Sequence, residues 1–194
     1  TNNLTNELNK GIAQMNKLVA ENAITVLNNS DKEFFPLTDE NKKIAFVGIG
    51  IDSANAFASR LKNDLKADAF YFNYKEDARR IATSVELIKG HYNAVVIGLH
   101  DYRRYPANNF GISEYALDLI RQIQQNNKTI VFDFGNPYAI KNFCEAKNLV
   151  ACYEDDSITQ NVAADILEGK IIAQGTLSVT VCDNYKYGSG FRSE

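Results

Sequence analysis

Five short apolar segments recur along the chain from residue 43 onward, and segments with helical periodicity separate them. Each apolar segment is almost continuously hydrophobic, which is typical of strands covered on both faces, as in a parallel sheet. We expect strands at residues 44–49, 69–72, 94–99, 129–134 and 149–153. We expect helices at residues 53–65, 75–89, 113–125, 137–147 and 157–168. The alternation predicts an α/β fold in which a mostly parallel sheet of five or six strands forms a three-layer αβα sandwich.

The segment before this alternation carries a helix and an extended clip. Apolar side chains recur at helical spacing over residues 4–19, which predicts an amphipathic opening helix of about six turns. Turn-forming residues follow, and Phe34–Leu37 then reads as an apolar clip that is held by Pro36 and closes one end of the core.

The segment after the alternation reads differently. Residues 177–181 alternate like a strand with one exposed face, and residues 184–194 are polar and rich in glycine. We therefore divide the chain into a leading helix and clip of the same domain (1–42), an α/β core (43–181) and a polar tail or linker (182–194).

Composition narrows the function classes. A chain of 194 residues with 45% hydrophobic content fits one domain with a full core. The net charge of −3 comes from 21 basic and 24 acidic residues that are scattered, so we expect no nucleic acid or anionic membrane as partner. No apolar run approaches the roughly 20 residues of a membrane span. The first residues show neither Met nor a signal pattern, so we expect the chain to begin inside a longer protein.

The three cysteines, Cys144, Cys152 and Cys182, give no metal signature. They are odd in number and lack the short paired spacings of a zinc site. We expect buried or free thiols.

The loop that follows the central strand 94–99 is the candidate contact site. Open α/β sheets place their ligands at the carboxyl ends of such strands. The loop combines forked donors, a proton carrier, a carboxylate and stacking faces in His100, Asp101, Tyr102, Arg103, Arg104 and Tyr105. We expect it to contact substrate or a neighbouring domain; the alternative is a solvated polar loop with a packing role.

Two other motifs favour structural interpretations. Residues 48–53 follow a strand and open a helix, where a phosphate could bind, but Ser53 stands where the dinucleotide fingerprint needs a third glycine. A tight turn is the better interpretation, and we expect no cofactor. The acidic run 154–156 resembles a metal or catalytic cluster, yet Asp156 is placed to begin the helix at Ser157.

Several segments together carry a resemblance to a known family. They are Ala23–Asn29, Phe35–Leu37, Lys43–Gly48, Phe132–Tyr138 and Ile166–Leu177. Their order and spacing resemble the carboxy-terminal α/β domain of family 3 glycoside hydrolases, although Ala173 and Ser178 stand where the family usually has prolines. The resemblance implies a flavodoxin-like sandwich that packs on a catalytic barrel of the same polypeptide, a barrel that these 194 residues do not contain. It also favours a periplasmic or secreted protein over a cytoplasmic one.

The resemblance also bears on catalysis. In the β-glucosidase branch this domain supplies the general acid/base glutamate from the loop after its third strand, and Arg104 stands close to that place here. Arginine cannot donate a proton near neutral pH, and Asp101 is out of register. The departure implies the β-N-acetylglucosaminidase branch, which acts on amino-sugar glycans with both catalytic groups on the barrel. We therefore expect no catalytic, cofactor or metal residue in this chain.

One further partner domain and two other classes of function are also compatible with the sequence. Some bacterial members carry a β-lactamase-like module after this domain, and residues 187–191 are compatible with such a junction. The rival classes are a stand-alone module that binds a nucleotide or small anion, and a structural interaction domain whose parent has lost activity.

Overall fold

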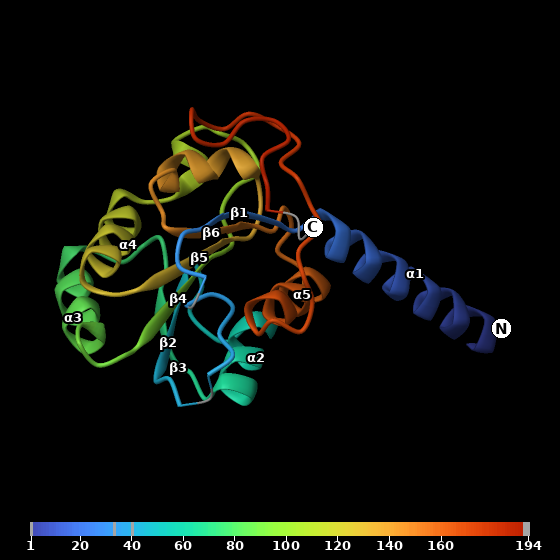
Figure 1. Ribbon diagram of the computed structural model, residues 1–194, viewed down its shortest axis with the longest axis horizontal. Coiled ribbons are helices and arrows are strands. Elements are labelled where there is room, and N and C mark those ends of the chain that lie inside the picture. The colour runs from blue at the N-terminus through green and yellow to red at the C-terminus, as the bar shows by residue number, and fades with distance from the viewer. Residues whose placement is uncertain (1, 33, 40, 192–194) are drawn as a thin grey trace.

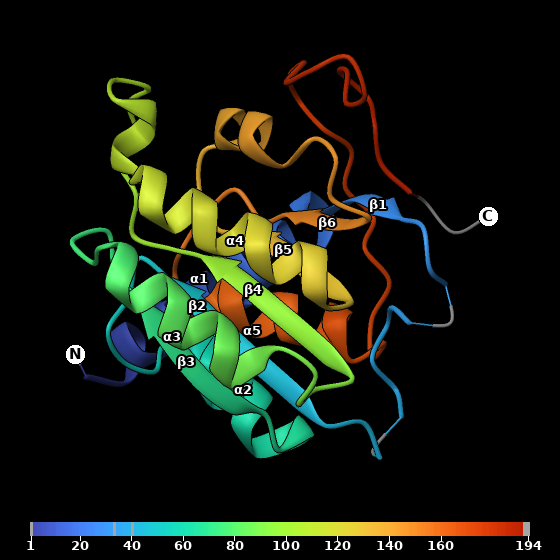
Figure 2. The same ribbon diagram turned by 90° about the vertical axis from the view of Figure 1, so that its left-hand side faces the viewer.

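A six-stranded sheet lies between two layers of helices in the computed structural model, which describes residues 2–32, 34–39 and 41–191 (Figures 1 and 2). The sheet order is β1-β6-β5-β4-β2-β3. The strands are β1 (Thr25–Asn29), β2 (Ile44–Ile49), β3 (Asp68–Phe72), β4 (Ala94–Leu99), β5 (Thr129–Asp133) and β6 (Asn148–Ala151). The helices are α1 (Asn2–Ala23), α2 (Ala56–Leu65), α3 (Ala78–Ile88), α4 (Glu114–Asn126) and α5 (Ser157–Leu167), with 3₁₀ turns η1 (Asn109–Gly111) and η2 (Pro137–Phe143).

The five strands from β2 to β6 are parallel, and their order is that of the flavodoxin-like doubly wound fold. This confirms the predicted fold class. The sixth strand, β1, pairs antiparallel with β6 at the edge of the sheet. The sequence pattern did not single out β1 as a strand because its apolar residues continue directly from those of the preceding helix.

Alternate residues of the central strands build two cores. On β2, Val47 and Ile49 face the layer made by α3, α4 and η2, whereas Phe46 faces α2 and α5. All six residues of β2 and all six of β4 are buried, as their continuous hydrophobicity predicted. Phe35 and Leu37 are also buried, and the Leu37 N–H donates to the Leu167 carbonyl oxygen, so the clip closes the α5 side of the core.

Two expected elements differ from the structure. The segment expected as a helix at 137–147 is the 3₁₀ helix η2, capped by the Asn136 side chain at the Tyr138 N–H. Residues 177–181 form no strand, although the Leu177 N–H donates to the Ser189 carbonyl of the folded-back tail. Their alternation reflects burial instead: Leu177 is buried in the core, with Val179 and Val181 packed against it.

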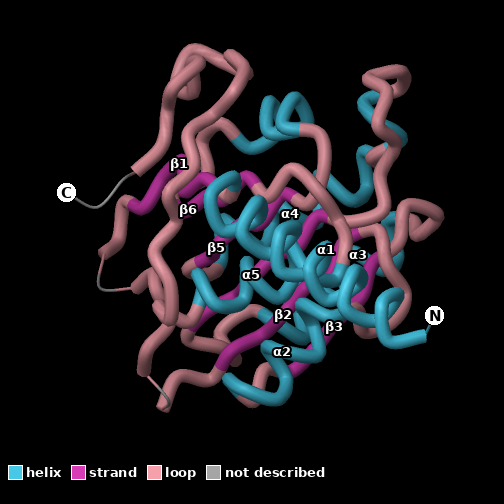
Figure 3. Tube along the Cα trace, turned by 90° about the vertical axis from the view of Figure 1, so that its right-hand side faces the viewer, coloured by secondary structure: helices cyan, strands magenta, loops and turns pink. Residues whose placement is uncertain are grey.

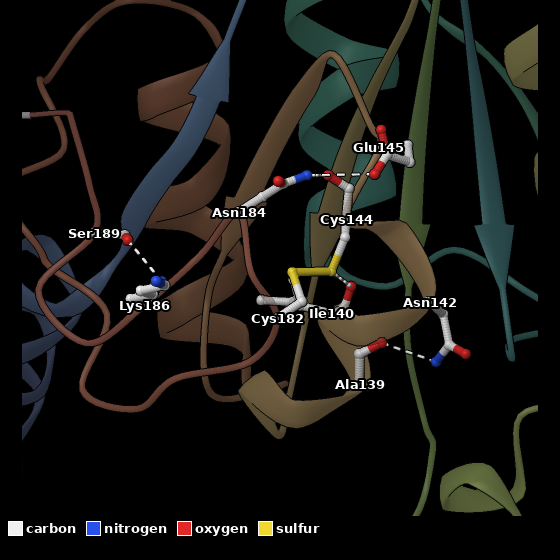
Figure 4. The surroundings of a disulfide bond; sticks show 9 residues. All are labelled: Ala139, Ile140, Asn142, Cys144, Glu145, Cys182, Asn184, Lys186 and Ser189. Atoms are coloured by element: carbon white, nitrogen blue, oxygen red, sulfur yellow. Dashed lines mark hydrogen bonds between the residues drawn. A yellow bond between two sulfur atoms is a disulfide. The ribbon is translucent and has the colours of Figure 1, made fainter.

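The expectation of three buried or free thiols is wrong for two of the cysteines. Cys144, which follows η2, forms a disulfide with Cys182 of the tail, and Asn184 donates to the Cys144 carbonyl beside it (Figure 4). The two positions are 38 residues apart, so only the fold brings them together. Cys152 is free and buried, as expected.

The tail continues from the disulfide to the edge strand, where the Phe191 N–H donates to the Val26 carbonyl at 2.9 Å. The last three positions of the predicted tail, 192–194, lie outside the described residues. Among the helices that the structure describes, none is long and apolar enough to cross a membrane.

Candidate functional site

The loops after β4, β5 and β6 meet at the carboxyl edge of the sheet and surround a hollow of about 580 Å³. Parallel α/β sheets bind their ligands at this edge. The hollow is lined by Asp101, Tyr102, Arg103, Arg104, Phe134, Gly135, Asn136, Pro137, Tyr138, Tyr153, Glu154, Asp155 and Asp156. Four residues of the predicted contact loop, 101–104, therefore border one hollow together with residues from two other loops.

His100 lies behind the hollow rather than in it. Its side chain is fully buried, and its ring stacks on Phe134 with centroids 4.5 Å apart. The preceding Gly98 leaves room for this ring, because a Cβ at that position would lie 2.5 Å from His100 Nε2. His100 therefore does not face the hollow itself but contacts residues that line it, such as Phe134.

The hydrogen-bond partner of His100 is Asp155, which lies in the loop after β6. His100 Nδ1 lies 2.7 Å from Asp155 Oδ1. Since a carboxylate only accepts hydrogen bonds, Nδ1 carries the proton in this pair. Asp155 also accepts from the backbone N–H of Asp101 at 2.9 Å and from the side chain of Gln160 at 2.8 Å. One carboxylate thus fastens the loop after β4 to the loop after β6.

The turn after β2 supports the same loop. Gly50 adopts a φ of +89°, and a Cβ there would lie 2.1 Å from the His100 carbonyl oxygen. The Tyr74 hydroxyl donates to that oxygen at 2.6 Å. Burial and the charges of Asp133, Asp101 and Asp155 raise the Tyr74 pKa, so the hydroxyl keeps its proton. Residues 48–53 therefore form the tight turn that the sequence favoured, and its glycine allows close approach to His100.

A fully buried carboxyl, that of Asp133, lies at the end of β5. The Tyr102 hydroxyl lies 2.9 Å from its Oδ1, and its Oδ2 is buried without a hydrogen-bond partner. Full burial raises the pKa of Asp133 to about 8, despite the hydrogen bond from Tyr102, and the charge of Asp155 adds to the rise. Asp133 is therefore mostly neutral at pH 7, which lowers the cost of its unpartnered oxygen.

The charged groups of the loop are open to solvent. Asp101, Arg103, Arg104 and Tyr105 are exposed, and the Arg104 side chain is 87% exposed. Arg104 Nη2 lies 3.8 Å from Glu154 Oε2, a loose pair between two exposed side chains. The backbone beneath is fixed more firmly, since the Asn136 side chain donates to the Arg104 carbonyl and the Arg103 N–H donates to the Phe110 carbonyl. The loop thus presents exposed charged side chains on a backbone that hydrogen bonds hold in place.

Two carboxyl groups that were not predicted as site residues, Asp133 and Asp155, lie at the predicted loop. Asp133 contacts Tyr102, and Asp155 lines the hollow together with Tyr102, Arg103 and Arg104. A signal for both was available, since each stands at the carboxyl end of an expected strand. Asp156, by contrast, caps α5 as expected, accepting from the Thr159 N–H. Within the described ranges, no group of three or more His, Cys, Asp or Glu could hold a metal ion. The site offers charged donors and acceptors for binding.

No model of a known protein family matches the chain, and no curated protein matches its sequence. Solved structures do match its fold. A fungal multi-domain β-N-acetylglucosaminidase of glycoside hydrolase family 3 superimposes with a TM-score of 0.71 at 17% identity. A family 3 β-N-acetylglucosaminidase from a Paenibacillus species gives 0.67 at 21%, and a β-glucosidase from Listeria innocua gives 0.69 at 18%.

In these three comparisons the match covers 90%, 85% and 85% of this chain, but only 20%, 32% and 26% of the other chains. The chain therefore spans a third or less of the length of these enzymes. Its fold is that of one α/β region within β-N-acetylglucosaminidases of family 3 and a β-glucosidase. The resemblance inferred from the sequence segments is confirmed at the level of the fold.

Proposed function

We propose that this chain is the accessory C-terminal domain of a family 3 glycoside hydrolase of the β-N-acetylglucosaminidase type. In this role the domain packs on a catalytic barrel and shapes its site, while the barrel carries out the reaction on an amino-sugar glycan. The observation that supports it most is the fold match to two family 3 β-N-acetylglucosaminidases over 85% to 90% of this chain.

The fold match alone does not separate this activity from that of a β-glucosidase, because a β-glucosidase superimposes equally well. The chemistry of the loop after β4 favours the first. A general acid needs a proton that it can donate near neutral pH, and an arginine side chain, the residue type at position 104, does not supply one. Asp101 is the one carboxylate of the loop, and it is out of register with the general acid. Its backbone N–H donates to Asp155 and its φ is +49°, so the backbone is held in this position.

The Cys144–Cys182 disulfide favours an oxidising compartment, since structural disulfides persist in secreted and periplasmic proteins. The proposal therefore includes a periplasmic or extracellular location.

The test compares two proteins: this 194-residue chain, and the polypeptide encoded by the complete reading frame that contains it. We expect the longer polypeptide to hydrolyse a nitrophenyl β-N-acetylglucosaminide in preference to the matching β-glucoside, and this chain alone to hydrolyse neither. Retaining hydrolysis needs two carboxyl groups about 5 Å apart, and the proposal places both on the barrel. Turnover by the pure 194-residue chain, or a preference for the glucoside, would refute the proposal.

A further inference from the structure

Helix α1 carries a stripe of large apolar side chains that its own domain does not cover. The stripe consists of Leu4, Leu8, Ile12, Met15, Leu18 and Val19, and between 51% and 64% of each residue is exposed. Scattered apolar residues are normal on protein surfaces, but a contiguous row of them marks an interaction site. Figure 1 shows α1 extending away from the sheet, with its N-terminal end far from the rest of the chain.

The side of α1 that lies nearest its own domain is the more polar one, although residues 4–19 are exposed on every side of the helix. Ala13, Gln14 and Lys17 of α1 border a hollow together with Arg60 of α2 and residues of α5 that include Asp165. In Figure 3, α1 lies over α5, and the two helices are in contact. Among the residues of α1 whose burial the structure describes, 4–23, the one buried apolar residue is Ala20, near the C-terminal end. A surface helix normally does the reverse, so the apolar stripe is oriented for a body outside the described residues.

The width of the stripe indicates what kind of surface it fits. Leu8, Ile12, Met15 and Val19 follow the spacing of a coiled-coil seam, but Leu4 and Leu18 add a second row beside them. Two apolar positions in seven form the narrow seam between paired helices, whereas three in seven are typical of a helix that packs on a globular surface. The stripe thus fits a folded domain better than a single partner helix.

Its size argues against a second copy of this chain. Residues 4–19 span about 24 Å at a rise of about 1.5 Å per residue, and a strip roughly 10 Å wide covers about 240 Å². A stable complex of separate proteins buries about 800 Å² on each partner. A domain of the same polypeptide needs less, because the covalent link gives it a high effective concentration.

The C-terminal end of α1 lies beside the candidate site. Just after the helix, Thr25 Oγ1 lies 2.7 Å from the hydroxyl of Tyr153, which lines the hollow at the carboxyl edge. A body that covers this hollow is therefore adjacent to the base of α1. In the two β-N-acetylglucosaminidases that share the fold, 68% to 80% of the chain lies outside the matched region.

We infer that the apolar stripe of α1 is a docking surface for the catalytic barrel of the same polypeptide, an inference that rests on the proposed function. The barrel contacts the domain twice, at the carboxyl-edge hollow and along the stripe, and α1 sets the orientation between the two. The polar side of α1 stays against α5.

Met15 reports on this contact, because it is the sole methionine of the sequence and lies within the stripe. Its oxidation by dilute hydrogen peroxide is followed by mass spectrometry of the peptide that contains it. We expect Met15 to oxidise at least about tenfold more slowly in the longer polypeptide than in this chain, since docking favoured by about 1.4 kcal/mol leaves it open about a tenth of the time. In this chain its rate should match that of an exposed methionine at every protein concentration.

A pair of matched variants locates the protecting surface. Leu8→Glu with Ile12→Glu places two charges in the stripe, and Asn6→Glu with Asn9→Glu places two on exposed positions of the same helix outside it. The stripe variant should restore fast Met15 oxidation in the longer polypeptide, and the control should not. Both should leave the melting temperature of this chain within a few degrees, because all four positions are exposed.

Equal oxidation rates in the two proteins would overturn the inference, as would a reading frame that encodes no second domain. Protection that appears in this chain alone and grows with its concentration, alongside a doubled mass, would assign the stripe to a second copy instead. Glycosidase activity is measured on the same samples. Activity with an unprotected Met15 refutes the docking surface alone, whereas a protected Met15 without activity refutes the proposed function and leaves the surface standing.

Discussion

His100 Nδ1 lies 2.7 Å from Asp155 Oδ1, and this bond joins the loops after β4 and β6 at the carboxyl edge of the sheet. His100 is fully buried whereas the Asp155 side chain is 26% exposed, and the second oxygen of Asp155 accepts from the Asp101 N–H. The pair therefore decides how the exposed tips of the contact loop are presented. The His100–Asp155 hydrogen bond contributes to stability because it gives the buried His100 N–H an acceptor.

Replacing Asp155 with Ala should destabilise this chain by about 1 to 3 kcal/mol, because the buried His100 N–H loses its acceptor. Glu154→Ala is the matched control. The Glu154 side chain is 63% exposed and pairs only loosely with Arg104, so its loss should shift stability by no more than about 0.5 kcal/mol. Urea unfolding of the three proteins measures both effects. Indistinguishable stabilities for the two variants would show that the His100–Asp155 bond contributes nothing.

Asp133 should make stability depend on pH. Its folded pKa is about 8, whereas an unfolded Asp titrates near about 3.9, so between these values the native state holds one proton more than the unfolded state. Stability contributed by this group is therefore complete below about pH 4 and is lost as the pH rises through 8, by up to about 1.4 kcal/mol per pH unit.

Asp133→Asn mimics the neutral acid and removes this dependence. We expect the variant to gain stability relative to the natural protein as the pH rises from about 4, near the unfolded pKa, to the folded pKa of about 8, and the difference to stay constant above it. Urea midpoints of both proteins at each pH supply the measurement. Parallel pH profiles for the two proteins would contradict the assignment.

Arg103→Ala combined with Arg104→Ala should lower glycosidase activity or weaken domain docking in the longer polypeptide. Both side chains are exposed at the hollow, so the melting temperature of this chain should hardly change. Lys62→Ala with Arg121→Ala is the charge-matched control, because both positions are exposed and neither lines the hollow. If the first pair unfolds this chain while the activity per folded molecule stays normal, the loop has a packing role.

Reduction of the Cys144–Cys182 bond should destabilise the chain. Closing a loop of 38 residues restricts the unfolded chain by an amount worth about 4 kcal/mol. We expect a reductant to lower the melting temperature of the natural protein, and Cys144→Ser with Cys182→Ser to melt at that lower temperature with or without reductant. Three reactive thiols in the denatured, unreduced protein would show that the bond does not form.

The hydrophobic pattern determined most of the fold. Strands β2 and β4 have the predicted bounds, and the other parallel strands agree to within two residues at each end. These elements are determined locally, since continuous burial and helical periodicity appear within a few consecutive residues. Segments with weak periodicity were harder to predict. A longer helix was expected in place of η2, and β1 was not predicted as a strand. The loop at 100–106 was placed at the correct edge because the carboxyl ends of parallel strands meet there.

The sequence by itself thus determined the class of fold, the edge of the sheet at which the candidate loop lies and the amphipathic character of α1. Only the tertiary structure decided which side chains meet. His100 finds Asp155 across 55 residues of sequence, and Cys144 finds Cys182 across 38. It also decided that the apolar stripe of α1 faces outward. Local periodicity records which side of an element is apolar, but what covers that side depends on contacts between distant segments, which no short stretch of sequence contains.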